Sequence, residues 1–310
     1  MIKTTCDILL PIAPSISDAE DLQSTYIVSC VLNSFLSYTA TMLNIVTIYA
    51  IRKTPSLPKL LKTLLLSLAV SDLGVGLLSE PVYIWLLVRW SRLRFSSCTV
   101  FNVLFFPVRL FVVTSYLIVV AISMERFLAI HLHLRYQELV THKRVVAVVM
   151  SIWIVCLLTS SMYFYRSRIV SVIFPFIGVA CIIATTFIYW KMYLVLRRHK
   201  DQIRALRSQE VQQAAQNEKV VNFARLKKSV VALFYVYLVF LICYFPRFVI
   251  LAARLIQGPH LTVKKSTIYS WTLVFLNSSL NPVIYCWKMR HIRHAIMKIL
   301  RHIIRRYRTF

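Results

Sequence analysis

The chain has 310 residues, of which 58% are hydrophobic and 15% charged, and its 37 Lys and Arg residues against 11 Asp and Glu residues give a formal net charge of +26. A basic nucleic-acid-binding domain carries its charge on a more polar chain, with about a quarter of its residues charged, so this composition argues against nucleic-acid binding. Apolar blocks separated by basic segments instead predict a protein that lies in a lipid bilayer.

The glycine and cysteine contents narrow the fold class. The chain has only 4 Gly, where average usage predicts about 22, so long uninterrupted helices are favoured over a β-barrel. Its 7 Cys are scattered and lack metal-binding spacing, which indicates neither a disulfide scaffold nor a zinc site.

A membrane-spanning helix needs about 20 mostly apolar residues. The sequence offers seven such stretches, at about residues 26–51, 62–88, 98–130, 145–165, 169–196, 226–253 and 266–287. Of the 37 basic residues, 26 lie in or beside the connections on one side, which the positive-inside rule places in the cytoplasm. The prediction is an all-α bundle of seven membrane helices with its N-terminus outside and its C-terminus inside.

The two ends of the chain differ in character. Residues 1–25 are predicted to form an extracellular segment and do not resemble a cleavable signal peptide. In residues 288–310, apolar residues recur every three or four positions and basic residues fill the other face. This pattern predicts a cytoplasmic amphipathic helix that contacts membrane lipids, with a calmodulin-target helix as the alternative.

Polar residues inside the apolar spans need a partner or a role, because a charged group there costs about 2.5–3.5 kcal/mol. Asp72 lies in the middle of the second span, and other spans supply neutral oxygens and amides. Those partners are Asn44, Ser115, Asn277, Ser278 and Asn281. A carboxylate ringed by neutral oxygens suits a small hard cation, and the alternative is an Asp that only hydrogen-bonds the helices together.

Two further features lie at the inner ends of the spans and within them. Glu125 precedes Arg126 at the end of the third span, where the arginine is either a releasable ion-pair partner or an interfacial anchor. Pro246 and Pro282 interrupt the sixth and seventh spans, and each removes a backbone hydrogen bond that otherwise keeps the helix straight.

Taken in chain order, these residues form a recurring set. The set is Asn44, Leu68-Ala69-Val70-Ser71-Asp72, Glu125-Arg126-Phe127, Trp153, Tyr189, Cys243-Tyr244-Phe245-Pro246 and Asn281-Pro282-Val283-Ile284-Tyr285. It resembles the rhodopsin-like (class A) family of G-protein-coupled receptors across about residues 26–306. The resemblance implies a plasma-membrane receptor, not an enzyme, that binds an extracellular ligand and activates heterotrimeric G proteins.

The resemblance also implies roles for particular residues. The residues expected to switch G-protein coupling are Glu125, Arg126, Tyr189 and Tyr285. The residues expected to bind a structural sodium ion are Asp72, Ser115, Asn277, Ser278 and Asn281. The hinge and toggle residues are Phe240, Cys243, Tyr244, Pro246 and Pro282. Asn44 and Trp153 are expected to anchor helices.

The sequence departs from the family pattern at several positions. The usual Asp-Arg-Tyr is Glu125-Arg126-Phe127, and Tyr244 replaces a Trp. The connection after the fourth span is very short and contains no Cys, so the family's usual outer disulfide cannot form, and Cys98 is either free or paired with Cys6 or Cys30. The short, Cys-free loop resembles the melanocortin, cannabinoid and lysophospholipid receptors.

The outer halves of the spans restrict the ligand. Val108 stands where amine receptors carry an Asp, and Phe275 stands where opsins carry the retinal Lys, so a monoamine and retinal are both disfavoured. The charged residues there are Glu80, Arg109 and Arg247, and the surrounding mouth is mainly basic. We expect an anionic ligand, such as an acidic peptide, a nucleotide-like molecule or a lysolipid, unless Glu80 simply pairs with one of the arginines.

Two other functions fit a multi-span protein. A transporter also places charged residues in broken helices, but it predicts paired repeats, which the sequence lacks. A receptor homologue that no longer signals would keep the same motifs. The sequence sets neither the ligand's identity nor the Gα class.

Overall fold

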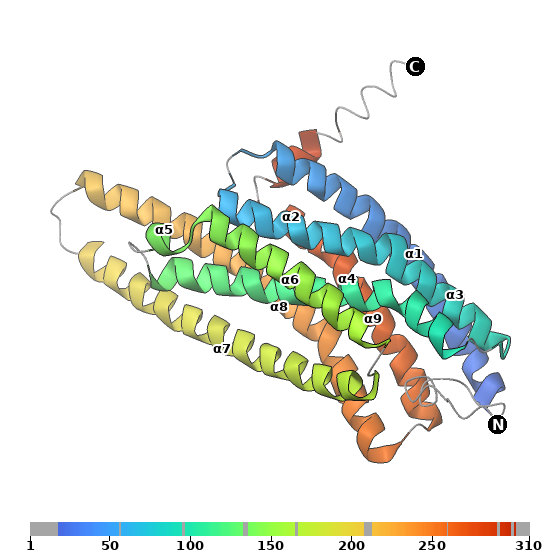
Figure 1. Ribbon diagram of the computed structural model, residues 1–310. Helices are drawn as coiled ribbons and strands as arrows, with labels where there is room; N and C mark the ends of the chain where they lie inside the picture. Colours follow the sequence, from blue (N-terminus) through green and yellow to red (C-terminus); the bar gives the residue numbers. More distant parts are fainter. Residues whose placement is uncertain are drawn as a thin grey trace, which may run out of the picture.

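The computed structural model describes residues 18–55, 57–94, 97–132, 136–164, 167–207, 213–258, 260–289, 292–298 and 301. Regular structure in these ranges is entirely helical, which confirms the predicted all-α class. The long helices lie side by side in one bundle (Figure 1). The elements are α1 (Ala19–Lys53), α2 (Lys59–Gly74), a π-helical turn (Val75–Ser79), α3 (Glu80–Ser91), α4 (Cys98–His131), α5 (Tyr136–Leu139), α6 (His142–Met162), α7 (Ser167–Arg207), α8 (Gln213–Gln257) and α9 (Leu261–Lys288).

Within the described ranges, six helical stretches are long and apolar enough to cross a membrane. They are Glu20–Lys53, Lys59–Ser91, Thr99–His131, His142–Met162, Phe176–Arg198 and Val230–Gln257. The helix α9 is more polar, but its 28 residues span about 42 Å, which exceeds the roughly 30 Å hydrocarbon core, and it packs between α8 and α1. It completes the predicted set of seven.

The second span is a continuous stretch with a local change of winding. A π-helical turn joins α2 to α3, and Pro81 follows directly at the start of α3. Because proline has no N–H, it cannot complete the α-helical ladder at this point, and the wider π-turn accommodates the missing bond. The hydroxyl of Ser37 in α1 donates to the Gly76 carbonyl at 2.7 Å and fixes this turn against α1.

The central helix is α4, which packs against α2, α6, α7 and α8, whereas α1 packs against α2, α3 and α9. Large apolar side chains also cover the outside of the bundle, including Phe35 and Tyr38 of α1, which are 66% and 64% exposed. A soluble protein rarely exposes so much apolar surface, and here it fits contact with lipid.

Both α7 and α8 extend beyond the predicted spans 169–196 and 226–253, and they run past the neighbouring helices (Figure 1). The long connection between the fifth and sixth predicted spans is therefore helical in its described residues. After α9, residues 292–298 form a further short helix in which Ile292 and Ile296 are buried while Arg293 and Lys298 are exposed. The remaining residues of the predicted extracellular segment and of the C-terminal amphipathic helix, 1–17, 290–291, 299–300 and 302–310, lie outside the described ranges.

Candidate functional site

A buried polar network surrounds Asp72 in the middle of the bundle. Its Oδ1 accepts hydrogen bonds from the Ser115 and Ser278 hydroxyls at 2.9 Å each, and its Oδ2 accepts one from Asn281 Nδ2 at 2.8 Å. Asp72 is fully buried and joins α2 to α4 and α9. The structure thus brings together four of the five residues predicted for the cation site.

The fifth residue, Asn277, is 1% exposed, and both polar atoms of its side chain lack a hydrogen-bond partner in the described part of the chain. The Asn281 Oδ1 atom is likewise buried and unpartnered there. Unpaired buried amides are costly, and neutral oxygens beside a carboxylate suit a hard cation such as Na⁺. Their presence makes the chemistry of this centre compatible with the predicted ion.

The two expected anchors each connect neighbouring helices. Asn44 Nδ2 in α1 donates to the Ser278 carbonyl in α9 at 3.0 Å. Trp153 Nε1 in α6 donates to the Ser67 hydroxyl in α2 at 3.0 Å.

An aromatic stack lies next to the polar network around Asp72. Phe240 and Tyr244 of α8 stack with ring centroids 4.4 Å apart, and Tyr116 of α4 lies 5.0 Å from Phe240 and 5.8 Å from Tyr244. Cys243 is buried beside them. Pro246 lies one turn further along α8, and Pro282 lies inside α9.

At the inner end of α4, Glu125 and Arg126 form a bidentate ion pair. Arg126 donates from Nε to Glu125 Oε2 at 2.5 Å and from Nη2 to Oε1 at 2.6 Å, and both residues are buried. The Tyr136 hydroxyl donates to the same carboxylate. Burial, reinforced by the Glu125 charge, raises the pKa of Tyr136, so this phenol stays protonated and able to donate.

The two tyrosines predicted to take part in coupling lie on different helices. The Tyr189 hydroxyl in α7 donates to the Leu233 carbonyl in α8 at 3.0 Å and accepts from the Ser123 hydroxyl in α4 at 3.2 Å. Tyr285 in α9 is 1% exposed, and its hydroxyl has no partner among the described residues. Tyr189 therefore connects α7 to α4 and α8, whereas the Tyr285 hydroxyl makes no hydrogen bond to a described residue.

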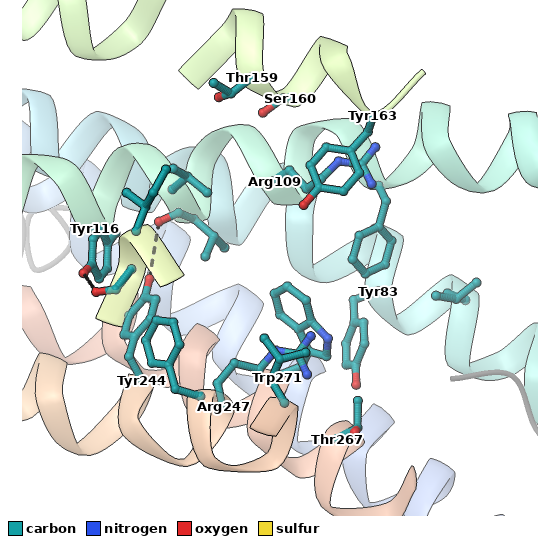
Figure 2. A pocket seen from close by; sticks show the side chains of 18 of the residues that line it. Tyr83, Arg109, Tyr116, Thr159, Ser160, Tyr163, Tyr244, Arg247, Thr267 and Trp271 are labelled. Carbon is teal, nitrogen blue, oxygen red and sulfur yellow. Dashed lines mark hydrogen bonds between the residues drawn. The ribbon is translucent and has the colours of Figure 1, made fainter. Parts of the chain in front are cut away.

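A cavity of about 380 Å³ lies in the outer half of the bundle, between α3, α4, α6, α7, α8 and α9. Arg109 of α4 and Arg247 of α8 project into it from opposite walls (Figure 2). Each guanidinium lies over an aromatic ring, Arg109 at 4.3 Å from the centre of Tyr163 and Arg247 at 4.6 Å from the centre of Trp271. Arg254 also lines the cavity, and the described lining contains no carboxylate.

The other two predicted pocket residues do not line the cavity. Val108 is fully buried in the core on the α4 face beside Arg109. Glu80 is also fully buried, but neither of its oxygens has a hydrogen-bond partner within the described ranges. The suggested internal pair between Glu80 and Arg109 or Arg247 is wrong, because Arg109 instead donates to the Asn102 carbonyl at 2.9 Å and Arg247 stacks on Trp271.

The cysteines bear on the open question of a disulfide. Five cysteines in the described part of the structure are free: Cys30, Cys156, Cys181, Cys243 and Cys286. A bond between Cys98 and Cys30 is therefore absent. The side chain of Cys98 and the whole of Cys6 lie outside the described part of the structure.

Sequence reasoning missed three residues of these sites. Tyr163 and Trp271, which hold the two arginines, were not separable from ordinary apolar aromatic residues. Tyr136 lies in a polar connection, where only its distance of ten residues from Arg126 could have suggested a contact with the ion pair.

The sequence is similar to known proteins of one family. Residues 43–285 match the protein family described as 7 transmembrane receptor (rhodopsin family). Sheep melanocortin receptor 5 is 27% identical over 76% of this chain and 72% of its own length. Sheep adenosine receptor A3 is 22% identical over 83% of this chain and 84% of its own length. Chicken adenosine receptor A2b is 33% identical over 43% of this chain and 37% of its own length. These relatives confirm the prediction of a receptor rather than an enzyme. The chain belongs to the rhodopsin family of seven-transmembrane receptors.

Proposed function

We propose that this receptor lies in the plasma membrane, binds an anionic extracellular ligand in the cavity between Arg109 and Arg247, and activates heterotrimeric G proteins through its inner end. The observation that carries the ligand proposal is the charge of the cavity. Two guanidinium groups enter an apolar space whose described lining has no carboxylate to balance them. An anionic ligand supplies that missing charge.

The relatives do not select the ligand. By name they are receptors for melanocortins and for adenosine, which are two chemically different ligand classes. The proposal therefore rests on the cavity of this chain. An acidic peptide, a nucleotide-like molecule and a lysolipid all carry the required negative charge.

The proposed output relies on the inner end of α4. The Glu125 carboxylate holds Arg126 while Tyr136 binds the same carboxylate, so the arginine is restrained in this arrangement. The ligand shifts the balance between two states only if it binds one of them more tightly. We propose that the favoured state releases Arg126 to contact a Gα subunit.

We also propose that Na⁺ binds beside Asp72. The carboxylate and the unpaired oxygens of Asn277 and Asn281 support this proposal, because they are the ligand types that hard cations prefer. A cation that binds only the inactive arrangement would stabilise it by mass action.

Agonist-independent G-protein dissociation in living cells tests the coupling proposal. The chain is compared with Arg126→Ala across the four Gα classes at matched surface expression. Lys143→Ala is the control, because Lys143 is an exposed basic residue on the same side of the membrane. We expect a basal signal in at least one class that Arg126→Ala loses and Lys143→Ala keeps. Equal signals from all three proteins would contradict coupling through Arg126 and favour a receptor homologue that does not signal.

A further inference from the structure

The cavity changes character along the bundle axis. Because α4 runs inward from Cys98 and α8 runs outward from Gln213, Tyr116 lies about two turns deeper than Arg109, and Tyr244 lies about one turn deeper than Arg247. The arginines and Trp271 therefore occupy the middle of the cavity, while Tyr116 and Tyr244 close its inner end (Figure 2).

At the level of the arginines, N–H groups remain available. Arg109 donates from Nη2 to the Asn102 carbonyl, but its Nε is buried and has no partner in the described structure. Arg247 lies over the Trp271 ring, 4.6 Å from its centre, and forms no ion pair with a described residue. A ring below a guanidinium accepts none of its N–H groups as an oxyanion does, so these donors remain for a planar or tetrahedral oxyanion.

The inner end offers no comparable polar group. The Tyr116 hydroxyl donates to the Gly178 carbonyl at 2.5 Å, and the Tyr244 hydroxyl donates to the Val112 carbonyl at 3.4 Å, so both phenols are already bonded to backbone (Figure 2). Thr159, on the α6 wall, bonds to its own helix. Apart from the small hydroxyl of Ser160 beside Thr159, the remaining described lining at this end is aliphatic or aromatic, namely Val112, Val113, Leu117, Val155 and Phe248.

We infer that the ligand is an amphipathic anion, whose compact oxyanion head bridges Arg109 and Arg247 and whose apolar tail points inward against Tyr116 and Tyr244. This inference rests on the proposed function, namely that the cavity is the ligand site. It selects among anionic ligands, because a nucleotide base or a polar peptide side chain at the inner end would lose its water without finding a partner.

The same orientation connects the ligand to the aromatic stack. The tail reaches Tyr244, which stacks on Phe240 at 4.4 Å, and Phe240 in turn lies against Tyr116. Tyr244 and Phe240 belong to α8, so a tail that contacts them changes the packing that sets the position of that helix. A ligand with a head alone occupies the arginines without touching this stack.

Binding to the purified 310-residue chain in lipid nanodiscs tests the inference. The probes are unbranched saturated carboxylates of increasing length, alkyl phosphates of the same lengths, and the matching uncharged alcohols, and the readout is the ligand-induced shift in unfolding temperature. We expect affinity for either anion series to rise about fourfold per methylene, from about 0.8 kcal/mol for each buried CH₂, up to a tail of roughly 10 Å. The alcohols correct for partitioning into lipid.

Two sets of variants separate the contribution of the head from that of the tail. Arg109→Gln and Arg247→Gln should each weaken anion binding by about tenfold or more and leave alcohol binding unchanged, since a charge-assisted hydrogen bond contributes about 1.5–3 kcal/mol. Arg89→Gln is the control, because Arg89 also stacks on an aromatic ring, Trp85, but does not line the cavity. Val113→Phe should shorten the best tail, whereas Val103→Phe, on an exposed face of α4, should not.

The unfolding temperature without ligand shows whether each variant folds, and Arg109→Lys, which keeps the positive charge, replaces Arg109→Gln if the latter does not fold. It should then retain anion binding over alcohol binding. Equal affinities for anions and alcohols, or an optimum tail length that Val113→Phe leaves in place, would overturn the inference. Because the readout needs no G protein, absent signalling would contradict the coupling proposal alone.

Discussion

The hydroxyl group of Tyr136 donates a hydrogen bond to the Glu125 carboxylate, the same group that binds Arg126 through two N–H groups. The contact ties the short helix α5 to the inner end of α4. Since a hydrogen bond to a carboxylate helps to keep that group in place, Tyr136→Phe should loosen the restraint on Arg126. We expect basal G-protein activation to rise about fivefold, which corresponds to about 1 kcal/mol. Basal activity at or below that of the unaltered receptor, at matched expression, would contradict this role.

The effect of Tyr136→Phe should not depend on pH. Burial raises the pKa of Tyr136 above its ordinary value near 10, and the neutral, donating phenol is therefore the form present throughout the physiological range. The contribution of its hydrogen bond is complete below that ordinary value and is lost only as pH rises through the raised one. Nucleotide exchange in membranes at pH 6.5 and pH 8 should show the same ratio of variant to unaltered receptor. A ratio that changes over this interval would show that another group titrates in the contact.

The sequence predicted the features that depend on residue type and spacing within one helix. Apolar runs located the membrane helices, because lipid demands about 20 apolar residues whatever the neighbours are. The partners of Asp72 were predictable because a buried carboxylate requires donors and few polar side chains occur in the spans. The ion pair of Glu125 and Arg126 was predictable because the two residues are adjacent.

Features that depend on how helices rotate against one another were not predictable. The π-helical turn at Val75–Ser79 rotates the outer part of the second span, so periodicity read across it does not place Glu80. An arginine partner for Glu80 was one alternative that the sequence allowed, but each arginine lies over an aromatic ring from another part of the chain. The contacts of Arg109 with Tyr163 and of Arg247 with Trp271 join α4 to the residue that follows α6 and α8 to α9, and a single sequence does not show which side chains of different helices meet.

The proposed Na⁺ site predicts a dependence of stability on the choice of salt. Purified receptor should unfold at a higher temperature in sodium chloride than in choline chloride at equal ionic strength, because a cation bound only to the folded state stabilises it by RT ln(1 + [L]/Kd). Asp72→Asn removes the charge that Ser115, Ser278 and Asn281 surround, and this variant should lose the difference. A difference between the two salts that persists in Asp72→Asn would place the sodium effect elsewhere.

The close approach of α1 to the π-helical turn predicts that Gly76 is intolerant of a side chain. A Cβ atom there would lie 2.7 Å from Thr41 Oγ1 and 2.9 Å from the Thr41 backbone nitrogen, and backbone cannot move aside cheaply. Gly76→Ala should destabilise the receptor by about 1–3 kcal/mol through overpacking. Thermal unfolding of the purified protein measures the loss.

Ser37→Ala is the appropriate comparison for Gly76→Ala, because it removes the hydrogen bond to the Gly76 carbonyl without adding volume. Its expected cost is smaller, about 1 kcal/mol. If Gly76→Ala unfolds at the same temperature as the unaltered receptor, α1 can move away from the turn, and the packing argument fails.

At the cytoplasmic end of the bundle, Lys288 of α9 lies over two aromatic rings, 3.9 Å from the centre of Tyr235 and 3.4 Å from the centre of Trp287. Tyr235 belongs to α8, which carries the expected hinge residue Pro246 and which we propose moves away from α9 on activation, so this cation–π contact joins α8 to the last helix of the bundle. Movement of α8 away from α9 must break the contact. Lys288→Gln should therefore favour the active arrangement and raise basal G-protein activation about fivefold, for a contact of about 1 kcal/mol.

Two variants separate the effect of losing this contact between helices from the effect of losing a positive charge. Lys288→Arg keeps a cation over the rings and should leave basal activity unchanged. Lys191→Gln removes a cation that lies over Phe187 and Trp190 of its own helix, α7, so its loss releases no second helix and should also have no effect. A basal signal that rises equally in Lys191→Gln and Lys288→Gln would attribute the change to the cytoplasmic charge, because of these two lysines Lys288 contacts two helices and Lys191 contacts its own helix alone.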